Sequence, residues 1–213
     1  MYPYTQKAQQ NECLICHRPL LQIISLSHYL YPLTLCPDCL SQFHILDFQT
    51  TFHHYPLRIL YEYNDFFRTL LYQYKGLYDY ALKDAFLCLY LSELRMKYDE
   101  HIIAVAPSSS QDNEVRGFAP MQAIAQTFSQ HVFTGLYKKE KYKQSGLSYH
   151  NRQEVSKKID IHHKEQLQGQ KVLIFDDVIT SSATLSTCLS LVESCHPASI
   201  ELLVLSTKSY VHF

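Results

Sequence analysis

The sequence contains no tryptophan and only five glycines among its 213 residues. Because glycine is scarce, any loop that requires a left-handed backbone has to be identified one position at a time. Charged residues are also few, at 18%, whereas hydrophobic residues make up 46%, and this balance excludes an extended disordered chain. Lys and Arg number 19 against 20 Asp and Glu, so the net charge does not indicate a polyanionic partner.

A long apolar run is missing as well. The first twelve residues, MYPYTQKAQQNE, are polar and lack the hydrophobic stretch of a signal peptide. The longest uncharged apolar stretch, residues 19–37, contains Gln22, His28 and Pro32, so we expect no membrane span there. Seven cysteines without a secretion signal favour a reducing cytoplasm, where paired cysteines bind metal more often than they form disulfides.

Two CxxC motifs lie near the N-terminus. Cys13-Leu-Ile-Cys16 and Cys36-Pro-Asp-Cys39 are separated by 19 residues. Two such turns can supply four thiolates to one tetrahedral ion, which predicts a closed structural Zn²⁺ site held by Cys13, Cys16, Cys36 and Cys39. Two redox pairs or four unrelated core cysteines are the alternatives. We expect residues 1–50 to form this metal module and residues 51–213 to form a second domain.

The second domain alternates between strand and helix patterns. Its apolar runs predict strands at residues 57–63, 101–106, 132–137, 171–176 and 199–206. Helical patterns lie between them, at residues 65–75, 78–97, 117–130 and from about 184 onward. This alternation predicts an α/β fold with a mostly parallel sheet and helices on both faces.

One segment of the second domain has the composition of a ligand site. The predicted strand ends in Asp176 and Asp177, and the polar turn Thr180–Thr184 opens a helix. Backbone N–H groups at a helix start bind anions, and the two carboxylates could accept hydrogen bonds from the hydroxyls of a sugar phosphate. The alternative is an ordinary strand–turn–helix in which the acids only cap the helix.

This segment resembles the phosphoribosyl pyrophosphate (PRPP) motif of type I phosphoribosyltransferases. The resemblance implies that the ribose hydroxyls contact the two acids and that the 5′-phosphate lies in the following loop, the whole set being Asp176, Asp177, Thr180, Ser181, Ser182, Ala183 and Thr184. It also implies Mg²⁺ as a cofactor with PRPP. Ser182 stands where the family usually has glycine, and its Cβ would crowd the phosphate or require a positive φ angle.

A narrower resemblance covers nearly the whole chain. A CxxC…CxxC module followed by such a domain resembles the ComF family of late competence proteins, ComFC-type members included, and further support comes from Tyr74-Lys75-Gly76, Arg116-Gly117-Phe118 and Gln144…Arg152. Two departures are Ala119-Pro120 in place of a polar pair and the absence of basic residues in the segment 108–111. The family serves natural transformation, so the implied partners are incoming single-stranded DNA, a ComFA-type competence helicase and a recombination mediator. The implied location is the cytoplasm, at the inner face of the membrane beside the uptake machinery.

Residues 137–158 form a basic stretch in an otherwise near-neutral chain. They contain seven Lys or Arg and two Glu, a local charge of 7 − 2 = +5, with three interleaved tyrosines. Charge and rings of this kind suit the backbone and bases of single-stranded DNA. The candidate DNA-binding residues are Arg116, Lys138, Lys139, Lys141, Tyr142, Lys143 and Arg152. Alternatively, the stretch is a solvated loop whose charges serve solubility.

Three functions are therefore open. The first is a competence protein that handles single-stranded DNA and has a PRPP-type site. The second is an active phosphoribosyltransferase that uses PRPP and Mg²⁺ on a nucleobase or amine. The third is a zinc-containing adaptor with a vestigial pocket. We further expect the Tyr- and Phe-rich block 43–80 to provide core packing rather than a base-stacking surface.

Overall fold

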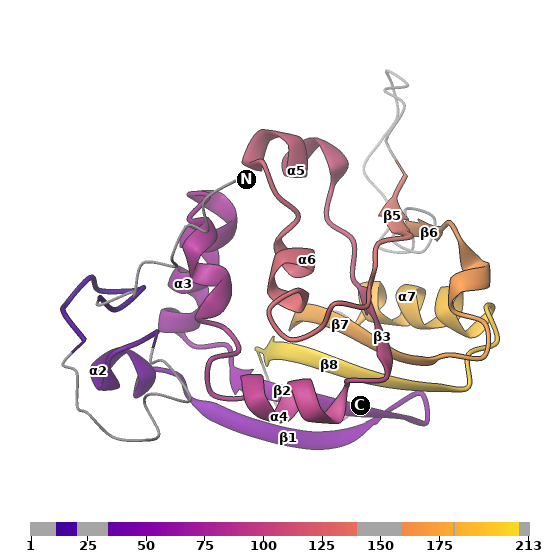
Figure 1. Ribbon diagram of the computed structural model, residues 1–213, viewed down its shortest axis with the longest axis horizontal. Helices are drawn as coiled ribbons and strands as arrows, with labels where there is room; N and C mark the ends of the chain where they lie inside the picture. The colour runs from indigo at the N-terminus through magenta and orange to yellow at the C-terminus, as the bar shows by residue number, and fades with distance from the viewer. Residues whose placement is uncertain (1–11, 21–33, 140–158, 181, 209–213) are drawn as a thin grey trace, which may run out of the picture.

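The computed structural model describes residues 12–20, 34–139, 159–180 and 182–208 (Figure 1). In this part of the chain the main sheet has six strands in the order β1-β2-β8-β7-β3-β4. The β1–β2 pair is antiparallel, and the other neighbours are parallel. The strands are β1 (Ile45–Phe52), β2 (Tyr55–Glu62), β3 (His101–Val105), β4 (Val132–Phe133), β7 (Lys171–Ile179) and β8 (Ser199–Thr207). A separate antiparallel pair consists of β5 (Leu136–Lys138) and β6 (Ile159–Ile161).

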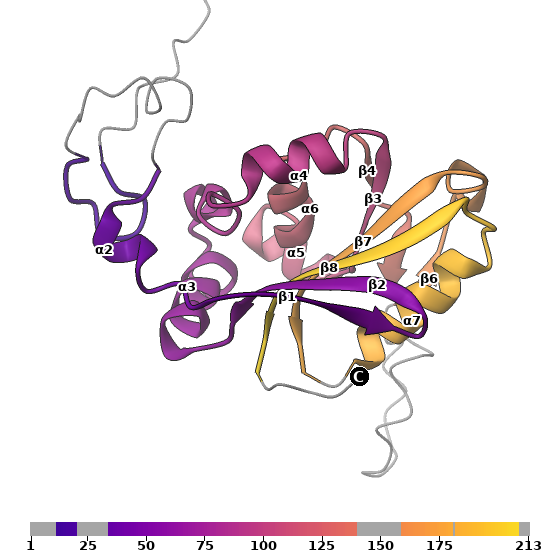
Figure 2. The same cartoon turned by 90° about the horizontal axis from the view of Figure 1, so that it is seen from below.

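Helices cover both faces of the main sheet. Figure 2 shows α4 and α6 on one side of it and α7 on the other. The helical elements are α2 (Pro37–Leu40), α3 (Asp65–Gly76), η1 (Tyr80–Asp84), α4 (Leu91–Lys97), α5 (Ser110–Arg116), α6 (Pro120–Ala125), η3 (Lys164–Gln166) and α7 (Ala183–Glu193). The predicted α/β architecture is therefore confirmed. Among the helices described, none has the length and apolar character needed to cross a membrane.

The alternation of side chains along β7 divides the core into two clusters. Leu173 and Phe175 face the cluster that contains α3, α4 and α6, whereas Val172 and Ile174 face the cluster that contains α7. Strands buried on both faces are typical of parallel sheets covered by helices. For the same reason β2 is buried over residues 57–61.

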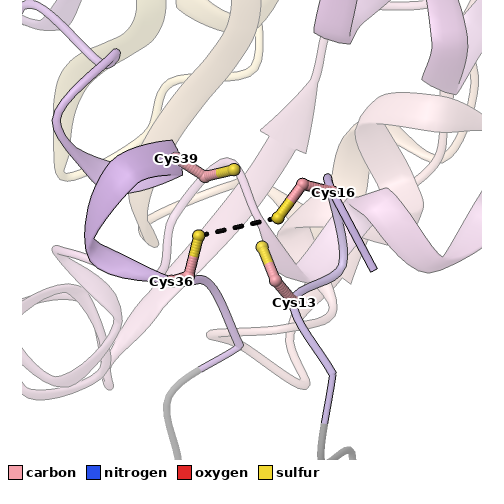
Figure 3. Close-up of side chains that lie close together, drawn as sticks. All are labelled: Cys13, Cys16, Cys36 and Cys39. Carbon is pink, nitrogen blue, oxygen red and sulfur yellow. Dashed lines mark hydrogen bonds between the residues drawn. The ribbon is translucent and has the colours of Figure 1, made fainter. Parts of the chain in front are cut away.

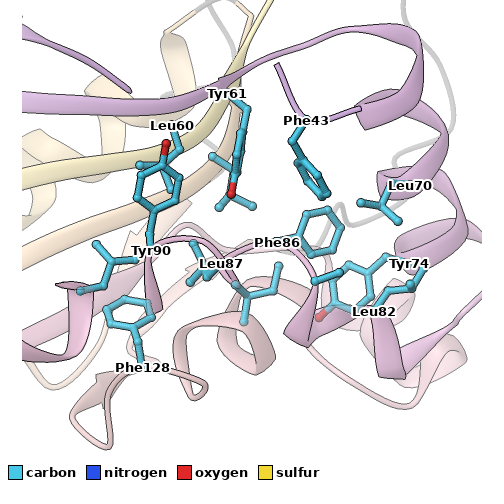
Figure 4. Close-up of a cluster of buried hydrophobic side chains, with 14 of the residues drawn as sticks. Phe43, Leu60, Tyr61, Leu70, Tyr74, Leu82, Phe86, Leu87, Tyr90 and Phe128 are labelled. Atoms are coloured by element: carbon cyan, nitrogen blue, oxygen red, sulfur yellow. The ribbon is translucent and has the colours of Figure 1, made fainter. Parts of the chain in front are cut away.

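The first cluster is rich in aromatic rings (Figure 4). Phe43 lies 5.0 Å from Tyr61 between ring centroids, and Tyr74 lies 5.3 Å from Phe86. Most of the aromatic block 43–80 is thus core, as predicted, although Tyr72, Tyr78 and Tyr80 are exposed. Cys13, Leu14 and Cys36 belong to this same cluster, so the cysteine module packs directly on the rest of the chain. The expected boundary after residue 50 falls within β1.

Several predicted elements have different bounds in the structure. The strand predicted over 132–137 is divided between β4 and β5, which belong to different sheets. The predicted strand ending at residue 176 continues to Ile179, because β7 keeps pairing with β8 as far as Thr207. The helix predicted over 78–97 is instead two shorter elements, η1 and α4, and the buried residues Ala85, Phe86 and Leu87 lie in the turns between them. Likewise, 117–130 holds only the short helix α6, and the preceding helix α5 and the strand β1 were not expected.

Candidate functional site

The four cysteines of the CxxC motifs meet at one end of the molecule, beyond α3 and far from α7 (Figures 1 and 2). Their sulfur atoms all lie within 4.8 Å of one another, and Sγ of Cys16 is 3.6 Å from Sγ of Cys36. Tetrahedral Zn²⁺ with Zn–S bonds of about 2.3 Å requires sulfur atoms about 3.8 Å apart. Figure 3 shows the four thiols converging from two backbone turns. The four thiols are therefore close to the arrangement that a tetrahedral metal ion requires.

Local backbone bonds shape each turn of this cluster. The N–H of His17 donates to the carbonyl of Cys13 at 2.9 Å, and the N–H of Cys39 donates to the carbonyl of Cys36 at 3.1 Å. Arg18 donates from Nε to Sγ of Cys16 at 3.4 Å and pairs with Asp38 at 2.8 Å. The backbone and side chain of Arg18 lower the pKa of Cys16 to about 6, which favours the thiolate that a metal binds.

The two acids of the predicted sugar-phosphate motif lie within β7 rather than after it. Successive residues of a strand point in different directions, so Asp177 meets Lys75 of α3, whereas Asp176 lies toward α7. The two carboxyl groups nevertheless remain close enough to interact with each other. Burial is the main cause that raises the pKa of the Cys188 thiol near Asp176. Asp176 is only 8% exposed, and its Oδ1 accepts a 2.9 Å hydrogen bond from the N–H of Asp177.

The two carboxyl groups have opposite protonation tendencies. Burial, reinforced by the neighbouring Asp177, raises the pKa of Asp176 well above its usual value. Burial also opposes ionisation of Asp177, but the ammonium of Lys75 overcomes this effect and lowers the pKa of Asp177. Lys75, at the end of α3, forms an ion pair with Asp177. The pair thus favours a protonated Asp176 beside an ionised Asp177.

Two further motifs converge on this ion pair. Arg116 donates from Nε to the carbonyl of Lys75 at 2.8 Å, and its guanidinium lies 5.8 Å from the ring centre of Phe118. The buried Tyr74 lies 5.2 Å from Phe118 between ring centroids and donates its hydroxyl to the carbonyl of Pro120 at 2.7 Å. Segments 74–76, 116–118 and 176–177 are therefore neighbours in space.

The loop after β7 leads into the N-terminus of α7. Ser182 has φ of 49°, so the positive φ expected there is confirmed. Its side chain makes no capping hydrogen bond to the helix, which leaves the first N–H groups of α7 without that partner. Thr180 is exposed and Thr184 is half-buried, while Ser181 lies outside the described residues.

The structure describes only some of the candidate DNA-binding residues. Lys141, Tyr142, Lys143 and Arg152 lie outside the described residues, as does Gln144. Lys138 and Lys139 are exposed at the end of β5, and Lys139 pairs with Asp160 at 2.8 Å. Tyr137 is stacked on His162, with ring centroids 4.1 Å apart. Arg116 lies beside Lys75, close to the acids of β7.

Sequence reasoning gave no site role to Lys75 and none to Asn113. Asn113 accepts hydrogen bonds through Oδ1 from Arg116 at 3.2 Å and from Ser108 at 2.6 Å. Lys75 had a usable signal, since it is a basic residue directly before the glycine that ends a helix. Its pairing with a residue 102 positions later could not be deduced from that local pattern.

Comparison with solved structures gives low overlaps. Hypoxanthine phosphoribosyltransferase of Staphylococcus aureus matches with TM-score 0.38 and 15% identity, over 59% of this chain and 63% of that enzyme. The hypoxanthine-guanine enzyme of Bacillus anthracis matches with TM-score 0.39 and 18% identity, over 61% and 75%. The match thus spans less than two thirds of the S. aureus enzyme, and overlaps this low carry no conclusion about activity.

Comparison with sequence families is decisive, although no curated protein sequence matches the chain. The family model described as the phosphoribosyl transferase domain matches residues 92–209, which is more than half of the chain. The matched region runs from α4 through β8 and includes Arg116, both acids of β7 and the loop before α7. The expected type I phosphoribosyltransferase fold is thereby confirmed, and the chain belongs to the phosphoribosyl transferase domain family.

Proposed function

We propose that this protein binds PRPP at the carboxyl end of β7 and handles single-stranded DNA as a competence protein of the ComF type. The observation that carries the proposal is the convergence of three separate segments, 74–76, 116–118 and 176–177, on one place beside β7. Ligands of α/β sheets bind at the carboxyl ends of the strands, and this place is such an end.

The chemistry of the site suits a sugar phosphate. Asp177 offers an ionised carboxylate for ribose hydroxyls, and a protonated Asp176 offers a donor as well as an acceptor. The start of α7 offers N–H groups for the 5′-phosphate. Mg²⁺ prefers carboxylate and phosphate oxygens, so it would accompany the diphosphate with the ionised Asp177 as a protein ligand.

The cysteine module is proposed to hold one Zn²⁺ through Cys13, Cys16, Cys36 and Cys39. Four thiolates within 4.8 Å suit Zn²⁺ and leave no coordination position for a substrate, so the ion would be structural. Because the module shares a core with β2 and α3, its metal would also stabilise the face of α3 that carries Lys75.

The competence role is favoured by the order of the motifs and by exposed cations near β5. Lys138 and Lys139 stand where the chain enters residues 140–158, which contain most of the basic stretch. Single-stranded DNA would follow these charges, and a competence helicase and a recombination mediator would be its further partners. Binding should then weaken with salt, with a log–log slope of about −0.7 for each phosphate neutralised.

An active phosphoribosyltransferase is the second candidate. It is favoured by membership of the family and by the retained acids Asp176 and Asp177. Against it stands Ser182, because a serine at φ 49° carries a strained backbone where the phosphate would bind. Ser182→Gly should relieve this strain and tighten PRPP binding if the loop is a functional phosphate site.

Parallel titrations of the full chain with PRPP, by calorimetry, and with a labelled oligonucleotide, by fluorescence anisotropy, test both parts of the proposal. Binding of both ligands, with salt-dependent DNA binding, is the expected result. If neither the native protein nor Ser182→Gly binds PRPP, the site is vestigial. Release of free pyrophosphate on adding nucleobases or amines would instead establish the transferase.

A further inference from the structure

Arg116 is a fixed cation without a counterion in the part of the structure that is described. Its Nε and Nη1 donate to the Lys75 carbonyl and the Asn113 amide oxygen, and its plane lies near Phe118. Across residues 12–20, 34–139, 159–180 and 182–208, no carboxylate lies within ion-pair distance of it. A half-buried guanidinium that is oriented but not neutralised is suited to bind an anion.

Lys75 places a second, more flexible cation beside it. The carbonyl of Lys75 holds Arg116, while its ammonium pairs with Asp177, and the side chain is 27% exposed. A lysine ammonium on a flexible stem can exchange one anionic partner for another, whereas an arginine held by two hydrogen bonds stays in place. Exchange would release the Asp177 carboxylate, which the ion pair otherwise occupies.

The segment before α5 does not supply such charges itself. Ser108 donates its hydroxyl to Asn113 at 2.6 Å, and the hydroxyl of Ser109 accepts from the N–H of Asp112 at 3.3 Å as the cap of α5. Both hydroxyls are thus used to build α5 and, through Asn113, to orient Arg116. The positive charges beside Asp177 come instead from Lys75 of α3 and from Arg116, the last residue of α5.

We infer that Lys75 and Arg116 together form the diphosphate-binding subsite of the sugar-phosphate site, with Lys75 moving from Asp177 to the diphosphate when ligand enters. Arg116 supplies a fixed pair of donors, and Lys75 supplies a charge whose transfer frees Asp177 for the ribose hydroxyls. The subsite makes the chain select a sugar diphosphate over ribose 5-phosphate. This inference rests on the proposed function, since it assigns part of that same site.

Calorimetric titration with PRPP, ribose 5-phosphate and inorganic pyrophosphate tests the inference. The native protein should bind PRPP at least about tenfold more tightly than ribose 5-phosphate, since charge-assisted hydrogen bonds are the strong ones. Lys75→Met and Arg116→Met should each lower the affinity for PRPP about ten- to hundredfold. Each variant should therefore lose most of the preference for PRPP over ribose 5-phosphate. Lys75→Arg should restore part of the selectivity. Lys83→Met is the matched control, because Lys83 pairs with Asp84 and lies over Tyr80 rather than at the acids of β7.

The outcomes separate the two levels of the proposal. Equal affinity of the native protein for PRPP and ribose 5-phosphate would overturn the diphosphate subsite but leave a sugar-phosphate site standing. A gap that persists in both Met variants would place the diphosphate elsewhere. No binding of any of the three ligands would overturn the proposed function itself. If a variant fails to fold, competition in the native protein tests the same point. Inorganic pyrophosphate, but not inorganic phosphate, should then compete with PRPP for binding.

Discussion

The cysteine cluster and the proposed sugar-phosphate site are built in opposite ways. Each half of the cysteine cluster is a CxxC turn closed by local backbone bonds, such as His17 N–H to Cys13 and Cys39 N–H to Cys36. The proposed sugar-phosphate site instead joins α3, α5 and β7, and its central ion pair links residues 102 positions apart. A local site depends mainly on its own turns, whereas an assembled site depends on how well the sheet and its helices hold three segments together.

The largest effect is expected from breaking the local site. Cys36→Ser should abolish metal binding, since a structural Zn²⁺ contributes apparent binding free energies of about 10–16 kcal/mol in small modules. Elemental analysis should show one zinc per native chain and almost none in the variant, and residues before about 50 should become protease-sensitive. Cys88→Ser, in a half-buried cysteine outside the cluster, should keep its zinc. A native preparation free of zinc would contradict the proposal.

The assembled site should show a smaller but specific loss. Asp177→Asn removes the ionised carboxylate and leaves Lys75 without its partner, so PRPP affinity should fall about tenfold or more. Asp160→Asn is the control, because Asp160 is also paired with a lysine but lies on β6. Calorimetry that finds equal losses in both variants would show that Asp177 has no specific role.

Local patterns explain why the sequence predicted one region better than the other. The spacing of Cys13, Cys16, Cys36 and Cys39 specifies four convergent thiols by itself. Asp176 and Asp177 were placed after the strand because acids usually interrupt an apolar run, yet pairing with β8 extends β7 beyond them. The sequence therefore indicated both acids but not that Asp177 pairs with Lys75 of α3 while Asp176 is buried on the strand.

Longer-range packing limited the fold prediction in the same manner. The alternating strand and helix pattern was sufficient for the parallel core, because buried strands such as β3 and β7 are continuous apolar runs. The segment 78–97 was mistaken for one helix, since Ala85, Phe86 and Leu87 are buried from several sides at once. Strand β1 is largely exposed and mixes polar with apolar residues, so no clear period was present.

The opposite tendencies of the β7 acids predict a pH effect on stability. The raised pKa of Asp176 means that the folded state keeps a proton that the unfolded chain releases as the pH rises above about 4. Stability from this residue is therefore lost with rising pH. Asp176→Asn keeps the acceptor for the Asp177 N–H and has no proton to lose, so its melting temperature should exceed that of the native protein by a few degrees at pH 7.5.

Asp177 affects the pH dependence of stability with the opposite sign. Its lowered pKa contributes stability that is present above pH 4 and is lost as the pH falls through the folded-state value. At pH 4.5 the melting-temperature advantage of Asp176→Asn should shrink. At this pH a larger fraction of the unfolded native chain also keeps the proton on Asp176, so unfolding gains less from releasing it. Thermal scans at both pH values check this, and a constant difference would contradict a buried, protonated Asp176.

The smallest effect should distinguish two neighbouring lysines at the edge of the basic stretch. Lys139 already pairs with Asp160 at 2.8 Å, whereas Lys138 makes no ion pair with any described residue. A lysine that must leave a carboxylate gains less from a phosphate, so Lys138→Gln should weaken binding of single-stranded DNA more than Lys139→Gln. The expected loss for Lys138→Gln is a few-fold, with a salt slope shallower by about 0.7. Anisotropy at two salt concentrations measures both quantities. Equal slopes in the native protein and in both variants would place the DNA path away from β5.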